Sequence, residues 1–189
     1  DMTVFSFHPR KNLTTSEGGM VVTHNAEWAS AKRYFKHFGM KGQASREQTV
    51  FASGGTNYKM SDILAALGLE QLKVLDDIIE RRRVLAERYM EFLRHTPGVT
   101  LPDVPPQGHS WQTFCVFVQE RDRVMTRLRG GGVEAQIGTY ALHREPAYAG
   151  HPQVRLAEDL TGSAQAADNS LALPLFYTMT DQMQDEVMN

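Results

Sequence analysis

The feature that most constrains the fold is a long helical tract between residues 61 and about 94. Apolar residues recur along it at spacings of three and four, Ser61 occupies the N-cap position, and a Pro-Gly pair follows its end. The apolar stripe shifts part-way along, which predicts a bend near residues 72–76. We therefore place a domain boundary near residue 75, inside this tract.

The segment before the tract combines β-type runs with polar loops. Residues 3–7 and 20–23 are short β-type runs on either side of the polar stretch 8–19, which predicts a strand, a functional loop and a returning strand. A helix should follow, with Asn25 as its N-cap and Gly39 as its stop. Four of its residues repeat at helical spacing and are expected to lie in the core: Trp28, Ala31, Phe35 and Phe38.

Residues 41–58 are polar and Gly-rich and are expected to form an extended surface excursion. The part after the helical tract alternates helices and strands, expected at 113–118 (strand), 121–129 (helix), 133–137 (strand), 157–169 (helix) and from about 180 (helix). The fold class is therefore α/β. We expect residues 1–75 to be part of a larger domain and residues 76–189 to form a small α/β domain.

Composition and charge exclude several classes of function. The 20 basic and 22 acidic residues are scattered and give a net charge of -2, so no footprint for nucleic acid or anionic lipid stands out. The basic triplet at 81–83 lies among acidic residues, a pattern typical of a solvated helix face. The single cysteine, Cys115, cannot form an internal disulfide, and no cluster has zinc-ligand spacing. No signal peptide or membrane-spanning run is present, so a cytoplasmic location is expected.

Lys11, in the loop between the first two strands, is the candidate reactive group. A lysine in a polar loop is, taken alone, more often an ordinary surface residue. The hydroxyl of Ser6, five residues earlier, could hydrogen-bond a phosphate beside that amine, and the pair Gly18-Gly19 would let the backbone pack closely behind it. Residue 1 falls within a β-type run without a preceding turn, so we also expect an upstream portion.

Residues 5–20, FSFHPRKNLTTSEGGM, resemble the lysine motif of the DegT/DnrJ/EryC1/StrS aminotransferase family, SFH-x-x-K-x-x-T-x-GEGG. The resemblance implies that Lys11 is the Schiff-base lysine that binds pyridoxal 5'-phosphate (PLP). It also implies that Ser6 contacts the phosphate of the cofactor. Ser16 stands where the family usually has glycine, a departure that could alter the conformation of the loop.

Residues 55–72 are similar to a second segment of the family, G-x-NYRMS followed by AA-x-G-x-x-QL. The resemblance implies that Asn57 reaches into the site of a neighbouring subunit and binds the cofactor phosphate there. Without the resemblance, Asn57 is better explained as a turn residue before the cap at Ser61. Lys59 replaces the more usual arginine, which keeps the charge but loses the bidentate fork.

Residues 138–148 resemble, more weakly, the stretch of the family near the sugar substrate. The resemblance implies that Tyr140 and His143 bind the substrate, His143 through hydroxyl or phosphate groups. A structural role for His143 stays open at this point. No metal ligand is expected.

Taken over essentially all residues, the resemblance implies a fold-type I PLP-dependent aminotransferase, represented by the C-terminal portion of its large domain and its small C-terminal domain. The implied reaction transfers an amino group from L-glutamate to a nucleotide-linked keto-sugar in amino-sugar biosynthesis, in a homodimer with shared active sites. The aspartate that the family places on the pyridine nitrogen would lie upstream. Two alternatives stay open: a sugar dehydratase, although the resembling dehydratases have histidine in place of Lys11, and a non-catalytic regulatory protein on the same fold.

Overall fold

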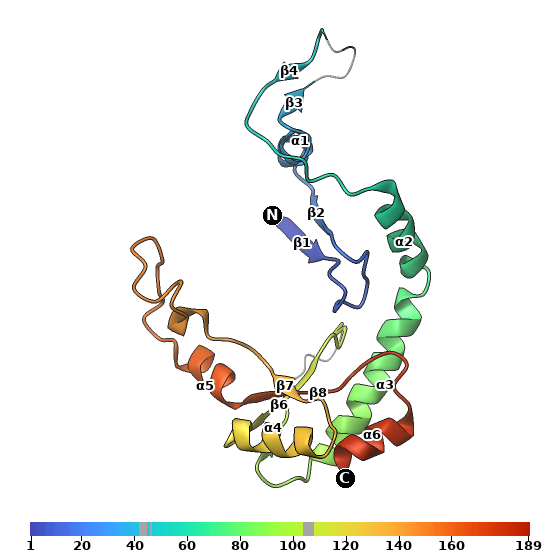
Figure 1. Cartoon of the computed structure of the whole chain (residues 1–189), viewed down its shortest axis with the longest axis vertical. Coiled ribbons are helices and arrows are strands. Elements are labelled where there is room, and N and C mark those ends of the chain that lie inside the picture. The colour runs from blue at the N-terminus through green and yellow to red at the C-terminus, as the bar shows by residue number, and fades with distance from the viewer. Residues whose placement is uncertain (42–44, 46, 104–107) are drawn as a thin grey trace. The chain divides into compact units, whose positions relative to one another are not determined.

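The computed structural model describes residues 1–41, 45, 47–103 and 108–189 and divides into two compact units, Asp1–Asp76 and Asp77–Asn189 (Figure 1). The element order mixes helices and strands in both units. Among the described helices, none is both long and apolar enough to cross a membrane.

The first unit begins with an antiparallel hairpin. Strands β1 (Met2–Ser6) and β2 (Gly19–Thr23) pair from Met2 opposite Thr23 to Ser6 opposite Gly19, so the expected strand, loop and returning strand are confirmed. Helix α1 (Ala26–Phe35) follows and is capped by Asn25, whose side chain accepts a hydrogen bond from Trp28 N at 3.0 Å.

The α1 helix differs from expectation in its end and in its packing. It ends at Phe35 rather than near Gly39, because the chain turns into left-handed backbone at Phe38, with φ of 58°. The expectation that the aromatic residues of this segment lie in the core was wrong. Trp28, Phe35 and Phe38 are 40–47% exposed and Ala31 is exposed too, because within the described part of the chain no element covers that face.

The predicted excursion at 41–58 forms a small hairpin, with β3 (Met40–Lys41) antiparallel to β4 (Val50–Phe51), although positions 42–44 and 46 lie outside the described residues. Helix α2 (Asp62–Leu72) is capped by Ser61 Oγ, which accepts from Leu64 N at 3.4 Å. A break then separates α2 from α3 (Leu75–Leu93), which confirms the expected bend.

The second unit is built on a four-stranded antiparallel sheet in the order β5-β6-β8-β7. Its elements after α3 are β5 (Val99–Thr100), β6 (Phe114–Val118), α4 (Arg121–Gly130), β7 (Gln136–Ile137), the short 3-10 helix η1 (Leu142–Arg144), α5 (Thr161–Asn169), β8 (Ser170–Leu173) and α6 (Asp181–Met188). The strand expected at 133–137 pairs only over its last two residues, and α5 begins four residues later than expected.

The hydrophobic core of the chain lies in this second unit, where α3 packs against the sheet. Leu85 and Tyr89 of α3 and Phe114 of β6 are fully buried, and the Tyr89 and Phe114 rings stack at 5.0 Å. The Tyr89 hydroxyl donates to the carbonyl of Pro174 at 2.9 Å, so its burial leaves no polar atom unsatisfied.

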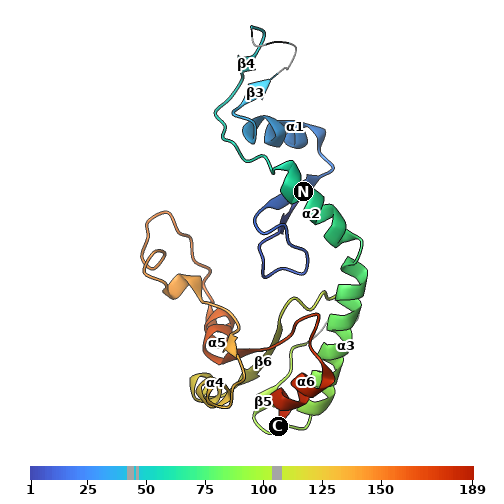
Figure 2. The same cartoon turned by 45° about the vertical axis from the view of Figure 1, so that its right-hand side comes forward.

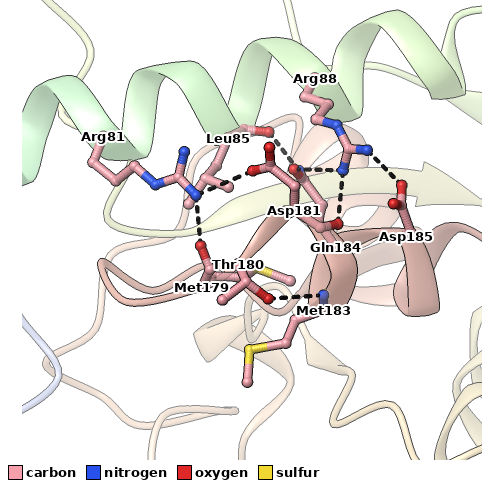
Figure 3. A network of polar contacts seen from close by, with 9 residues as sticks. All are labelled: Arg81, Leu85, Arg88, Met179, Thr180, Asp181, Met183, Gln184 and Asp185. Carbon is pink, nitrogen blue, oxygen red and sulfur yellow. Dashed lines mark hydrogen bonds and ion pairs between the residues drawn. The ribbon is translucent and has the colours of Figure 1, made fainter.

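Helix α6 lies beside α3, joined by a polar network (Figure 2, Figure 3). The Gln184 side chain is fully buried and donates to Leu85 O at 2.7 Å, while Arg88 donates to Gln184 and pairs with Asp185. Arg81 donates to Met179 O at 2.6 Å. These bonds fix the C-terminal helix on α3.

The basic triplet at 81–83 therefore does not form the solvated face that its pattern indicated. Only Arg83 pairs with carboxylates of its own helix. Arg82 is partly buried and donates to three backbone carbonyls, those of Trp111, Gln112 and Leu175, at 3.0–3.1 Å. Burial lowers the pKa of its guanidinium. The chain uses this cation to hold two loops rather than to face solvent.

Candidate functional site

The loop between β1 and β2 carries Lys11 and is closed by its own backbone. Phe7 N donates to Gly18 O at 3.0 Å, and Phe7 O accepts from Thr15 N at 3.1 Å and from Thr14 Oγ1 at 2.9 Å. Because three bonds converge on Phe7, the loop leaves the end of β1 in one defined conformation.

Lys11 and Ser6 are each bonded to the backbone of His8 at the start of this loop. Lys11 N donates to His8 O at 2.9 Å, and His8 N lies 3.5 Å from Ser6 Oγ. Lys11 is half-buried, and its amine has no hydrogen-bond or ion-pair partner among the residues that the structure describes. The start of the loop thus carries a primary amine without a partner among the described residues and, five residues earlier, the Ser6 hydroxyl.

The loop rests on α2 through residues that the sequence interpretation did not single out. Thr15 is 1% exposed, and a Cβ added at Gly68 would stand 2.8 Å from Thr15 Cγ2, so only glycine admits the loop this close to the helix. Three residues further along the same face, Gln71 Oε1 accepts from Thr14 N at 3.2 Å. The available signal was the three-residue spacing of Gly68 and Gln71, which places both on one face of a largely apolar helix.

The second half of the loop also depends on close approach. A Cβ at Gly18, whose φ is 143°, would lie 2.6 Å from Met60 Cε, so the backbone at Gly18 packs closely against Met60. Ser16 adopts left-handed backbone with φ of 69°, the region that glycine enters most easily. At this position, where the family pattern has glycine, the serine of this chain adopts a strained backbone conformation.

Asn57 stands on a segment fixed to the end of α1. Thr56 N donates to Phe35 O at 2.8 Å and Tyr58 N donates to Lys36 O at 3.1 Å, and Asn57 itself forms a β-bridge with His37. The Asn57 side chain is exposed and has no hydrogen-bond partner among the described residues. Its backbone is held while its amide group stays available.

Tyr140 and His143 belong to the other unit, so the structure describes them separately from Lys11. Tyr140 is exposed just before η1, and His143 lies half-buried within η1. The neighbouring Arg144 is tied to α5 by an ion pair with Asp168 at 2.7 Å. Within the described ranges, no group of three or more His, Cys, Asp or Glu side chains is arranged to hold a metal ion.

Comparison with known families gives one match that spans the chain. The model of the DegT/DnrJ/EryC1/StrS aminotransferase family matches residues 1–189. The chain belongs to this family. Among curated proteins, the chain is similar to the spore coat polysaccharide biosynthesis protein SpsC of Bacillus subtilis (strain 168), with 34% identity over 204 residues covering all of this chain and 52% of SpsC. The chain spans about half the length of the curated relatives it matches.

Solved structures of family members superpose on the whole chain. The aminotransferase TlmJ from Streptoalloteichus hindustanus has a TM-score of 0.87 and 30% identity, covering all of this chain and 50% of TlmJ. The sugar aminotransferase CalS13 from Micromonospora echinospora has a TM-score of 0.90 at 22% identity, covering all of this chain and 50% of CalS13. The fold is thus that of the fold-type I PLP-dependent aminotransferases, as the sequence predicted.

Proposed function

We propose that the complete protein is a PLP-dependent aminotransferase that transfers an amino group from L-glutamate to a nucleotide-linked keto-sugar. The observation that carries this proposal is the uncommitted amine of Lys11 on a loop braced by Gln71 and Thr15. A surface lysine without function would not need a buried threonine and a side-chain bond from another helix beneath its loop.

The residues present fit PLP. The Lys11 amine can hold the aldehyde carbon of the cofactor, and the Ser6 hydroxyl, which receives only the 3.5 Å contact from His8 N, can donate to a phosphate oxygen. When bound, PLP supplies an electron sink for the carbanion that proton loss creates on the amino donor. Arg10 N, by contrast, is occupied by His8 Nδ1 at 3.3 Å.

Lys11 then has two tasks. Its Nζ first anchors the cofactor, and after the amino donor has displaced it, Nζ accepts the proton that leaves the donor Cα. In the second half-reaction Nζ donates a proton to the carbon of the keto-sugar. Both tasks require that the loop hold Nζ in place while it is free, which is what the contacts of Thr14 and Thr15 with α2 supply.

Support for the sugar comes from relatives, and support for the finer assignment comes from the motifs. SpsC is named for polysaccharide biosynthesis and CalS13 is titled a sugar aminotransferase. The nucleotide link and the L-glutamate donor rest on what the family resemblance implies, and the cytoplasmic location is an expectation from the sequence. A sugar dehydratase is disfavoured because this chain has Lys11, and a non-catalytic regulatory protein is the alternative that the experiment must exclude.

Borohydride reduction of the complete protein in the presence of PLP, followed by peptide mass mapping, tests the proposal. We expect the pyridoxyl adduct on Lys11 and the loss of both adduct and transamination in Lys11→Ala. Lys73→Ala, at an exposed lysine paired with Glu70, is the matched control and should retain both. An adduct on another lysine, or none, would refute the assignment.

We further propose a homodimer with shared active sites, in which Asn57 binds the cofactor phosphate of the other subunit. Helix α2, which begins shortly after Asn57, is apolar on several faces and buries only Gly68, while Ile63 is 82% exposed. A helix of this kind needs cover, and a second copy that receives Asn57 would lie next to it.

Mixing two variants that are each impaired tests the shared site. Asn57→Ala should weaken cofactor retention about 10- to 100-fold, the loss of one hydrogen bond to a charged phosphate. Hybrid dimers of Asn57→Ala and Lys11→Ala would contain one site with both defects and one with neither, so activity should return on mixing. If the subunits exchange and no activity returns, Asn57 does not act across the interface.

Tyr140 and His143 are proposed to contact the sugar substrate. His143→Ala should then raise the KM for the nucleotide-sugar more than the KM for the amino donor. His151→Ala, at an exposed histidine further along the same segment, is the control. Equal effects on both substrates would assign His143 a structural role.

A further inference from the structure

The segment 138–144 carries the two side chains proposed to contact the sugar, and both of its ends are attached to the junction of α5 with β8. At its start, Gly138 N donates to Ser170 O at 3.0 Å, one residue beyond the pairing of β7 with β8. At its end, the Arg144 guanidinium pairs with the Asp168 carboxylate at 2.7 Å. Because the two attachment points stand two residues apart on α5 and β8, the segment closes on one place in the fold.

The first attachment requires glycine. A Cβ added at Gly138 would stand 2.5 Å from Ser170 Oγ and 3.2 Å from Cys115 Sγ, so a larger residue would push the segment away from the sheet. Ser170 is 3% exposed, and its carbonyl also accepts from the Arg121 guanidinium at 3.1 Å. The acceptor on β8 is therefore held from a second side, and Gly138 is attached to a fixed point.

Between the two attachments, one residue faces inward and its neighbours do not. Ala141 is 3% exposed, whereas Tyr140 and Leu142 are 67% and 59% exposed. Arg144 N donates to Ala141 O at 2.9 Å, which closes the turn of η1 behind the buried alanine. His143 is half-buried within that turn. The backbone of the segment is thus held in place, while the side chains proposed to contact the sugar are not used to hold it.

An exposed ion pair usually contributes little to the stability of a fold, and Arg144 and Asp168 are 47% and 57% exposed. The position of this pair nevertheless sets it apart. Among the described residues, three ion pairs join separate elements, of which two connect α3 to α6 and the third connects η1 to α5. The other pairs join residues at most four positions apart. The Arg144 pair therefore fixes the place of a segment.

We propose that Gly138 and Arg144 are positioning residues for the sugar substrate, an assignment that rests on the proposed function and deepens it. They act through the two side chains between them, Tyr140 and His143. Gly138 sets how closely the start of the segment approaches β8, and Arg144, through Asp168, sets where η1 lies along α5. A small displacement of either end would move the phenol and the imidazole away from the groups that they bind.

Steady-state kinetics of the complete protein test the role of the ion pair. Arg144→Gln and Asp168→Asn should each raise the KM for the nucleotide-linked keto-sugar about two- to fivefold, the range expected for one exposed ion pair, and leave the KM for the amino donor unchanged. Combining Arg144→Asp with Asp168→Arg should restore the KM. Arg123→Gln is the matched control, because it removes another exposed 2.7 Å ion pair from the same unit. All three side chains are exposed, so the variants should fold normally.

A double-variant cycle separates positioning from direct contact with the substrate. In a protein that already carries Tyr140→Phe and His143→Ala, Arg144→Gln should add little to the KM for the sugar, because the groups through which it acts are gone. An undiminished effect in that background would overturn the assignment. So would an effect of Arg144→Gln without one of Asp168→Asn, or equal rises in both KM values.

Gly138→Ala should have the larger effect, about tenfold or more on the same KM, because the added methyl group displaces the segment from β8. Ser170→Gly in the same chain removes the two nearest atoms, Ser170 Oγ and Cβ, and should recover much of the loss. Hydrogen exchange followed by mass spectrometry supplies a readout without catalysis. Exchange at residues 139–145 should become faster in Gly138→Ala and Arg144→Gln but not in Arg123→Gln, and unchanged exchange in the first two would overturn the assignment.

The kinetic outcomes also distinguish this assignment from the proposed function. If the complete protein aminates no nucleotide-linked keto-sugar, the proposed function fails and the assignment of Gly138 and Arg144 fails with it. If the protein aminates such a sugar and the variants at both positions keep its KM unchanged, only the assignment of Gly138 and Arg144 fails.

Discussion

The two units of the chain differ in how much of their apolar surface they bury themselves. The second unit encloses a core around Leu85, Tyr89 and Phe114, and every one of these residues is fully buried. In the first unit, strands β1 and β2 expose apolar residues on both faces, and α2 buries only Gly68. The second unit therefore buries its central apolar side chains by itself, whereas the first unit leaves most of its apolar side chains exposed.

The two units also differ in how many of their charged side chains form ion pairs within the unit. In the second unit, arginines of α3, α4 and η1 pair with carboxylates, as Arg88 does with Asp185 and Arg144 with Asp168. In the first unit, the only ion pair among described residues joins Lys73 to Glu70. Exposed apolar surface and unpaired cations are what residues show when their partners are a ligand or another chain. The proposed cofactor and dimer contacts both fall in the first unit, which has the fewer ion pairs among the described residues.

The largest expected difference between the units is the stability lost when a phenylalanine is replaced by alanine in the buried core of the second unit. Phe114→Ala should lower the free energy of unfolding by about 3–5 kcal/mol, because it removes a ring that Tyr89 and Trp111 contact. Phe51→Ala, at a phenylalanine of β4 that is 65% exposed, should change it by about 0.5 kcal/mol or less. Urea denaturation measures both. A comparable loss at Phe51 would mean that another part of the protein buries it.

A smaller effect depends on pH and again contrasts the units. Burial raises the pKa of Tyr89. The folded state favours the protonated phenol of Tyr89. The contribution of Tyr89 to the free energy of unfolding is therefore fully present below the ordinary tyrosine pKa of about 10, and it is lost as the pH rises through the raised pKa of the folded state. Tyr89→Phe should cost about 1 kcal/mol at neutral pH, through the lost bond to Pro174 O, and should show less destabilisation on going to pH of about 11.

Urea denaturation at both pH values measures the effect, and a Cys115→Ala background is needed. Burial also raises the pKa of the Cys115 thiol, so that group titrates in the alkaline range as well. Tyr58→Phe in the first unit, at a tyrosine 72% exposed, should leave the stability at neutral pH within about 0.5 kcal/mol. An alkaline transition unchanged by Tyr89→Phe would contradict the assignment of the destabilisation to Tyr89.

The smallest expected change in stability comes from replacing one residue with left-handed backbone in each unit by glycine. Ser16 and Glu120 both adopt left-handed conformations, with φ of 69° and 51°. Glycine at either position should relieve about 1 kcal/mol of strain, partly offset by the greater freedom of glycine in the unfolded chain. Glu120→Gly also loses its exposed ion pair with Arg123, so thermal denaturation should show the larger gain for Ser16→Gly. A loss at Ser16 would show that its side chain supports the loop.

Most elements of the fold were predictable because local signals specify them. Asn25 and Ser61 cap α1 and α2 as their sequence positions indicate, and the shift in the apolar stripe marks the break before α3. Burial was less predictable. The spacing of Trp28 and Phe35 indicates an apolar face but not whether this part of the chain supplies a surface to cover it, and the pattern around Arg82 did not reveal three carbonyls within its reach.

In the candidate site, Lys11, Ser6 and Asn57 were singled out through the family motifs, and their roles at the cofactor remain proposals. Thr15 and Gln71 were missed although both lie inside the quoted segments, since their role is a tertiary contact between a loop and a helix far apart in sequence.

The contact between Gln71 and the Lys11 loop also limits how the length of α2 can vary. Ser61 begins this helix directly after the segment that carries Asn57 and Lys59, and Gln71 near its other end supports Thr14. Removing one residue between them would rotate Gln71 by about 100° relative to Ser61 and shorten the helix by about 1.5 Å. Substitutions on the exposed positions of α2, such as Ile63, leave this spacing unchanged, whereas insertions and deletions would change the position of the Lys11 loop relative to the segment that carries Asn57. Family members should therefore share the number of residues between Ser61 and Gln71.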